Sequence, residues 1–138
     1  MSPTGDKTTQ GQHVMTKRKL EALTKYWQKQ LRIQDWIITP VFAKKEDMHS
    51  DTSVGQVTTH FAEKTAEIKI LSDKYRAVPD KGDLEIEETI VHELLHIVLL
   101  GYDMTSVNSK VYKLCIEQPI NQIAKALINA KYKTKEIK

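Results

Sequence analysis

The segment TIVHELLHIVLLGYD, from Thr89 to Asp103, constrains the fold more than any other part of the chain. Most of its residues are isoleucine, valine or leucine, and a helix that is apolar on nearly every side lies in the centre of a fold. Two histidines and a glutamate nevertheless occupy this run, at His92, Glu93 and His96. Buried polar groups without partners are costly. The segment therefore predicts a central helix whose polar residues have a bound partner.

The five residues HELLH fit the pattern H-E-x-x-H. On a helix, His92 and His96 lie one turn apart and point the same way, so both imidazoles can reach one Zn²⁺ at about 2.0–2.1 Å. Glu93 is rotated by about 100° around the axis, which places its carboxylate beside the ion. There it can take a proton from a zinc-bound water. The spacing predicts a hydrolytic site with Glu93 as the general base.

A catalytic zinc ion usually has three protein ligands and one open position, so one ligand has still to be identified. The downstream candidates are Asp103, just past the helix, and Glu117, on a second helical segment; His60 is the upstream candidate. A ligand at Glu117 would bridge two helices across the metal. Asn121 follows Glu117 by one helical turn, and its side-chain oxygen could accept the outer N–H of a ligating histidine. The alternative for Glu117 is a solvated charge beside an apolar stripe.

Hydrophobic periodicity around the motif predicts six elements. In chain order they are a helix beginning at Lys17, strands over residues 35–44, 56–64 and 65–71, a helix from Asp83 to about Leu100, and a helical region over about 105–132. This order predicts an α+β fold with a small three- to four-stranded sheet, mostly antiparallel or mixed.

Single residues refine these elements. Pro40 predicts that the first strand is an edge strand or contains a bulge. Asp83 predicts the N-cap of the motif helix. Pro119 predicts that the last helix kinks or restarts. Cys115 is the single cysteine, which excludes an intrachain disulfide, and it reads as a small buried hydrophobe.

The length of 138 residues suits one domain. We expect a disordered polar tail over residues 1–15, one domain over 16–132 and a basic tail over 133–138. The net charge of +3 is mild and does not favour nucleic acid as the main partner. There is no apolar signal sequence and no run as long as a membrane span. We therefore expect a monomeric cytoplasmic protein that does not enter the membrane.

The motif and its downstream glutamate resemble the gluzincin metallopeptidases. Glu117, in the segment EQPIN, follows His96 by 21 residues, and in gluzincins the third ligand is a glutamate on the helix after the H-E-x-x-H helix. The chain looks most like the minigluzincins and the small metallopeptidase domains of phages and bacteria. The glutamate segment is also similar to that of ImmA/IrrE-type proteases. The resemblance covers roughly residues 33–130 and implies a zincin-like core, with Zn²⁺ bound by His92, His96 and Glu117.

The resemblance and the residue chemistry both imply a zinc metalloendopeptidase acting on protein or peptide substrates, with Glu93 assisting the zinc-bound water. A hydrogen-bond donor should also stabilise the oxyanion, and the candidates are Tyr102, Tyr112 and His60. In this clan, the strand before the active-site helix often forms the rim of the cleft and binds extended peptide by strand addition. The segment over residues 65–71 is the candidate.

Three other readings stay open at this point. A metal-binding regulatory module of the same fold could act on one protein partner or on nucleic acid, with little general protease activity. A purely structural zinc site is a second reading, although such a site does not need the Glu93 carboxylate. The third has no metal: the histidines are core residues bonded to backbone groups, and Glu93 lies on a solvated edge.

Overall fold

The computed structural model describes residues 15–48, 54–72, 82–100 and 109–133. Three α-helices, a short 3₁₀ helix and a three-stranded sheet make up these residues. In chain order they are α2 (Lys17–Gln30), β1 (Ile37–Ala43), η1 (Lys45–Asp47), β2 (Gly55–His60), β3 (Thr65–Leu71), α3 (Gly82–Leu100) and α4 (Ser109–Lys133). The predicted α+β class is confirmed.

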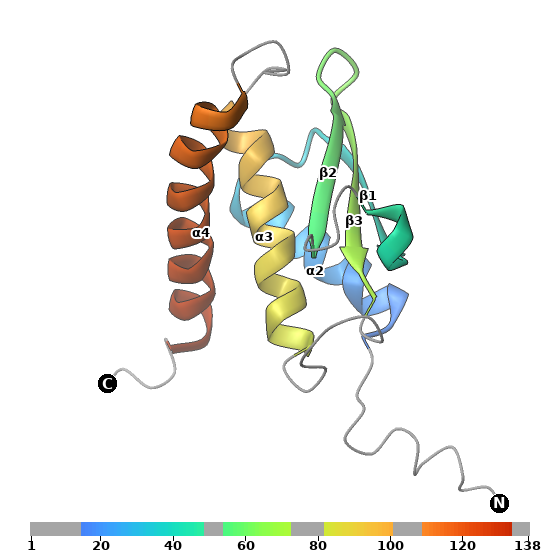
Figure 1. Cartoon of the computed structure of the whole chain (residues 1–138). Helices are drawn as coiled ribbons and strands as arrows, with labels where there is room; N and C mark the ends of the chain where they lie inside the picture. The colour runs from blue at the N-terminus through green and yellow to red at the C-terminus, as the bar shows by residue number, and fades with distance from the viewer. Residues whose placement is uncertain (1–14, 49–53, 73–81, 101–108, 134–138) are drawn as a thin grey trace, which may run out of the picture.

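The strands form a mixed sheet in the order β1–β3–β2 (Figure 1). The central strand β3 pairs with β1 in parallel and with β2 in antiparallel orientation. Its bounds are those predicted. The strand predicted over 56–64 ends at His60, because the next residues turn into β3 and Lys64 adopts a left-handed conformation with φ 56°. Pro40 lies in β1, an edge strand, as its missing N–H predicts.

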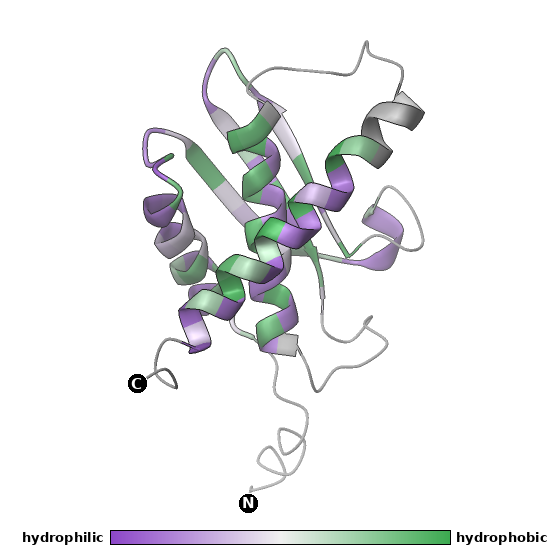
Figure 2. Ribbon diagram, turned by 90° about the vertical axis from the view of Figure 1, so that its left-hand side faces the viewer, coloured by the Kyte–Doolittle hydropathy of each residue, from purple (hydrophilic) through white to green (hydrophobic). Residues whose placement is uncertain are grey.

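The core lies between one face of the sheet and the helices. Alternate residues of β3, Ala66, Ile68 and Ile70, are buried on this face and belong to the same cluster as residues of all three helices. α3 contacts β2 and β3 on one side and α4 on another, while α2 contacts β1 and α3 (Figure 1). Hydrophilic and hydrophobic residues alternate along α4, the helix nearest the viewer in Figure 2. This amphipathic helix covers α3 from outside.

Several local predictions are wrong. Asp83 lies in the first turn of α3, which begins at Gly82, and is therefore not the N-cap. Of the two outcomes predicted at Pro119, a kink or a restart, the restart is absent, since α4 continues through this residue. The missing N–H of Pro119 would have bonded to the carbonyl of Cys115, and both residues are exposed, so water can satisfy that carbonyl. The exposure of Cys115 also contradicts its predicted burial.

The predicted N-terminal tail is one residue too long, since Met15 is 2% exposed and belongs to the core. Its other residues, 1–14, and the end of the basic tail, 134–138, lie outside the described residues, as do Tyr102 and Asp103. None of the helices in the described part of the chain combines the length and the apolar character needed to cross a bilayer.

Candidate metal centre

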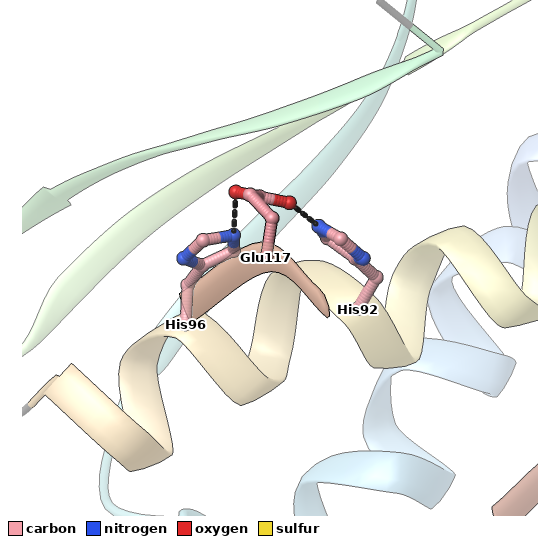
Figure 3. A group of neighbouring side chains, drawn as sticks. All are labelled: His92, His96 and Glu117. Atoms are coloured by element: carbon pink, nitrogen blue, oxygen red, sulfur yellow. Dashed lines mark ion pairs between the residues drawn. The ribbon is translucent and has the colours of Figure 1, made fainter. Parts of the chain in front are cut away.

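Two helices bring the predicted ligands together. His92 and His96 lie one turn apart on α3, and their Nε2 atoms face the Glu117 carboxylate of α4 (Figure 3). The His92 Nε2 to Glu117 Oε1 distance is 3.0 Å, and the His96 Nε2 to Glu117 Oε2 distance is 3.1 Å. Glu117, one of the candidates for the third ligand, is thus in direct contact with both histidines.

The geometry of these groups fits a metal ion. One ligand atom from each residue lies within 4.8 Å of the others. Ligand atoms about 2.0–2.2 Å from a tetrahedral ion lie about 3.3–3.6 Å apart, so a small outward movement of Glu117 would admit an ion. Glu117 is half-exposed and can move. Two imidazoles and one carboxylate suit several divalent transition metals, zinc among them.

The contacts in this cluster shift the pKa values of Glu117 and His92. Hydrogen bonds from His92 and His96 hold the pKa of Glu117 far below its usual range. Burial lowers the pKa of His92, but its bond to Glu117 and the charges of Glu93 and Glu117 raise it more, so the net shift is upward. Without an ion, the cluster therefore favours a negative carboxylate held between imidazoles. A divalent cation would replace the protons that bridge them.

Glu93 lies beside this cluster but is not part of it. Its side chain is 6% exposed, which contradicts a solvated edge. No hydrogen bond from a described residue contributes to its pKa, and its carboxylate lines a pocket, so it is not among the buried oxygens cut off from both partners and solvent. Burial raises the pKa of Glu93 to about 6, although the two histidines oppose the shift. A mostly buried carboxylate with a raised pKa that lines a pocket is typical of functional positions.

A pocket of about 270 Å³ opens next to His92 and Glu93. It is bounded by the first half of α3, the beginning of β2 and Asn121 of α4. The Asn121 side chain is a hydrogen-bond partner of His92 and raises its pKa, as expected for an acceptor. Asn121 therefore lies where a residue that orients a ligating histidine would lie.

Gly55 is a residue that the sequence did not single out. A Cβ atom at this position would lie 2.3 Å from Thr89 Cγ2 and 3.1 Å from Glu93 Oε2. The absence of a side chain thus lets β2 approach α3 at the level of Glu93. The available signal was an isolated glycine at the start of a strand, which often marks a close backbone approach.

Of the three oxyanion candidates, the structure places only the His60 side chain, and it does not lie at the cluster. His60 pairs with Thr65. Thr65 lies on the sheet face opposite to Ala66, Ile68 and Ile70, because side chains alternate along the strand. His60 therefore projects from the sheet face opposite the helices and is exposed, away from the cluster. Tyr112 lies in α4, but its side chain is not described, and Tyr102 lies outside the described residues.

The predicted rim strand is also wrong. β3 is central and has partners on both sides, so it has no edge to offer a peptide. The edge strand next to α3 is β2. Strand order depends on pairing between distant segments, which residue alternation within one strand does not reveal.

Comparisons with known proteins add no assignment to this geometry. No protein-family model, no curated protein and no solved structure matched the chain.

Proposed function

We propose that the protein is a zinc-dependent metallopeptidase of the gluzincin type, with a minimal zincin-like core. The observation that carries the proposal is Glu93, a 6% exposed carboxylate that lines the pocket beside the cluster of His92, His96 and Glu117. A structural zinc site would need the cluster but not this carboxylate. Core histidines would not need a glutamate from a second helix between their Nε2 atoms.

His92, His96 and Glu117 would hold the ion, and Asn121 would orient His92. A bound zinc ion supplies a Lewis acid that polarises the scissile carbonyl and makes a coordinated water more acidic. Glu93 takes the proton of the attacking water and passes it to the leaving amine. Burial makes the Glu93 carboxylate a stronger base, which suits proton uptake from the water, and the charge of a bound cation would favour its ionised form.

The edge strand β2 supports a mode of peptide binding. It contacts α3, and among the described strands it pairs with β3 alone. An extended substrate could add to its other edge through main-chain hydrogen bonds, which would hold the scissile bond over the α3 histidines. Gly55 contributes by letting this strand lie close to Glu93.

The test is Glu93→Gln in zinc-loaded protein, assayed on a mixture of unstructured peptides. We expect zinc content to stay the same and hydrolysis to fall about 10²–10⁴-fold, the usual contribution of a general base. Glu67→Gln, on the exposed outer face of β3, is the matched control and should retain activity. Unchanged hydrolysis in Glu93→Gln would contradict the proposal. Zinc binding by wild type without hydrolysis of any peptide would favour a regulatory module instead.

A further inference from the structure

One exposed face of α2 carries a line of positive charge. Arg18, Lys25 and Lys29 lie on this face, and Arg32 follows just after the end of the helix. At about 100° per residue, the first three side chains leave the helix within an arc of about 40°. All four residues are exposed, while the residues of α2 that belong to the core lie on its other side. We call these four residues the basic stripe.

The basic stripe is not neutralised by the described part of the chain. Four lysines elsewhere form ion pairs with carboxylates, namely Lys19, Lys64, Lys125 and Lys131. No such pair joins a residue of the stripe to a described residue. Glu21 is the one acidic residue of α2, so the face stays strongly positive. The net charge of the whole chain is only +3, and composition therefore does not reveal this local excess.

Helix stability does not account for the positions of these cations. The first turn of α2 contains Lys17, Arg18 and Lys19 but no acidic residue, although the helix dipole favours anions there. Lys19 is offset by its ion pair with Asp83, whereas Arg18 has no such pair with a described residue. Arg32 adopts a φ of 64°, a conformation that glycine adopts more readily. Both arginines therefore lower the stability of the helix, which favours a role in binding.

We propose that the basic stripe binds the phosphate backbone of a nucleic acid, without reading its sequence. Its ends, Arg18 and Arg32, lie about 21 Å apart at a rise of about 1.5 Å per residue. A straight line of cations matches a linear polyanion, whose charges also follow one another along one direction. Lysine and arginine are the side chains that most often contact phosphates in this way. A membrane is a poorer match, because the apolar face of α2 is buried in the core and cannot enter lipid.

The basic stripe is separate from the candidate metal centre. α2 packs on β1 and α3, whereas the cluster and its pocket are formed by α3, α4 and β2. Nucleic-acid binding therefore goes beyond the proposed peptidase function and does not depend on it.

The experiment measures binding of the full chain to fluorescent DNA by anisotropy over a series of salt concentrations. The probes are a duplex and a single strand of about 20 nucleotides, several times the length of the stripe. Four phosphate contacts predict a slope of log K against log salt of about −3.6 for the duplex, or about −2.8 for the single strand. Duplex affinity should therefore fall about a hundredfold between about 50 and 200 mM salt. The better-bound probe identifies the form of nucleic acid.

Variants locate the contacts. The four substitutions Arg18→Gln, Lys25→Gln, Lys29→Gln and Arg32→Gln, combined, should bring the slope close to zero, and each alone should reduce its magnitude by about 0.9. Arg32→Gly removes the same charge with a residue that suits the backbone, so its lost contact cannot be attributed to unfolding.

The matched control is Lys44→Gln with Lys45→Gln, which removes two exposed lysines outside α2 and should leave the slope unchanged. An unchanged slope in the combined variant, or an equal loss in the control, would overturn the inference. So would tighter binding to vesicles containing phosphatidylserine or to polyglutamate than to either DNA probe. Peptide hydrolysis should be the same in the combined variant as in wild type, so failure of this inference leaves the proposed function standing.

Discussion

Two buried glutamates lie on α3, and they differ in what reaches their carboxylates. Glu87 is 2% exposed and accepts hydrogen bonds from Trp27 Nε1 at 2.7 Å, from Lys131 Nζ at 2.5 Å and from the Tyr132 hydroxyl. Glu93 is 6% exposed and receives none from the described residues. The same residue type on the same helix is thus enclosed by protein donors at position 87 and faces a pocket at position 93.

The hydrogen bonds of Glu87 connect three helices. Trp27 lies on α2 and Lys131 and Tyr132 on α4, so Glu87 ties both to α3. The Lys131 ammonium also lies 4.2 Å from the centre of the Tyr26 ring, a cation–π contact. A buried charge with this many donors stabilises one arrangement of the helices.

The part of α3 that carries Glu93 packs against the first half of α4. Glu117 and Asn121 face the α3 histidines there, while Lys131 and Tyr132 hold the far end of the same helix. The two glutamates therefore have different roles. Glu87 stabilises the packing of α3 against α2 and α4, and Glu93 keeps a carboxylate available for chemistry.

The largest predicted effect concerns the ligand from α4. Glu117→Gln should lower zinc affinity roughly a thousandfold, because a binding free energy of about 10–16 kcal/mol is shared among three protein ligands. Competition with a chromogenic chelator measures the affinity. Asp103→Asn, the other downstream candidate, is the control and should bind zinc as wild type does. A large loss in Asp103→Asn with none in Glu117→Gln would reverse the assignment.

Glu87→Gln tests the role of Glu87 in packing. The glutamine keeps one acceptor oxygen, but its NH₂ group faces the protein donors that bind the Glu87 carboxylate. We expect the free energy of unfolding in urea to fall by about 3 kcal/mol, as when a buried charge pair loses one partner. Activity per folded molecule should change little. The exposed Glu63 in the β2–β3 turn provides the control variant Glu63→Gln. If Glu87→Gln unfolds like wild type but loses hydrolysis, Glu87 has no special role in packing and the contrast with Glu93 is wrong.

Substitution of Glu93 should have the opposite effect on stability in metal-free protein. The pKa of Glu93 rises from 4.5 to about 6 on folding, so the folded state binds this proton more tightly than the unfolded state. The free energy of unfolding of wild type therefore decreases as pH increases from about 4.5 to 6. Glu93→Gln lacks this titration. It should match wild type below pH 4.5 and exceed it by about 2 kcal/mol above pH 6. A constant difference across this range, measured by urea unfolding at each pH, would argue against a buried unpaired acid.

The smallest effect is expected where β2 meets α3. Gly55→Ala places a methyl group against Thr89 Cγ2 and should cost about 1–2 kcal/mol of stability. Thr89→Ser removes that carbon, so the double variant should recover most of the loss in a thermal unfolding experiment. The Thr89 hydroxyl bonds to the Glu85 carbonyl, which serine can still do. Additive effects of the two substitutions would mean that the close contact is absent.

Local patterns predicted much of this structure. The alternation of Ile68 and Ile70 predicted β3 to the residue, and the H-E-x-x-H spacing predicted that His92 and His96 share one face of a helix. Glu117 required a family resemblance, because its approach depends on how two helices pack. These features are encoded within a few residues of one another or in a known pattern.

Features that depend on distant pairing were missed. The donors to Glu87 lie 44 to 60 residues away in the sequence, so nothing near Glu87 indicates its burial. The edge position of β2 and the outward direction of His60 follow from the register with β3, not from either segment alone. The role of Gly55 appears only when Thr89 lies against it.

Anomalous diffraction at the zinc edge, from crystals of the zinc-loaded protein, tests the central claim most directly. We predict one zinc peak bound by the Nε2 atoms of His92 and His96 and by the Glu117 carboxylate, with the fourth position open to water and Glu93 beside it. A zinc ion with four protein ligands, or no zinc between these residues, would contradict the account.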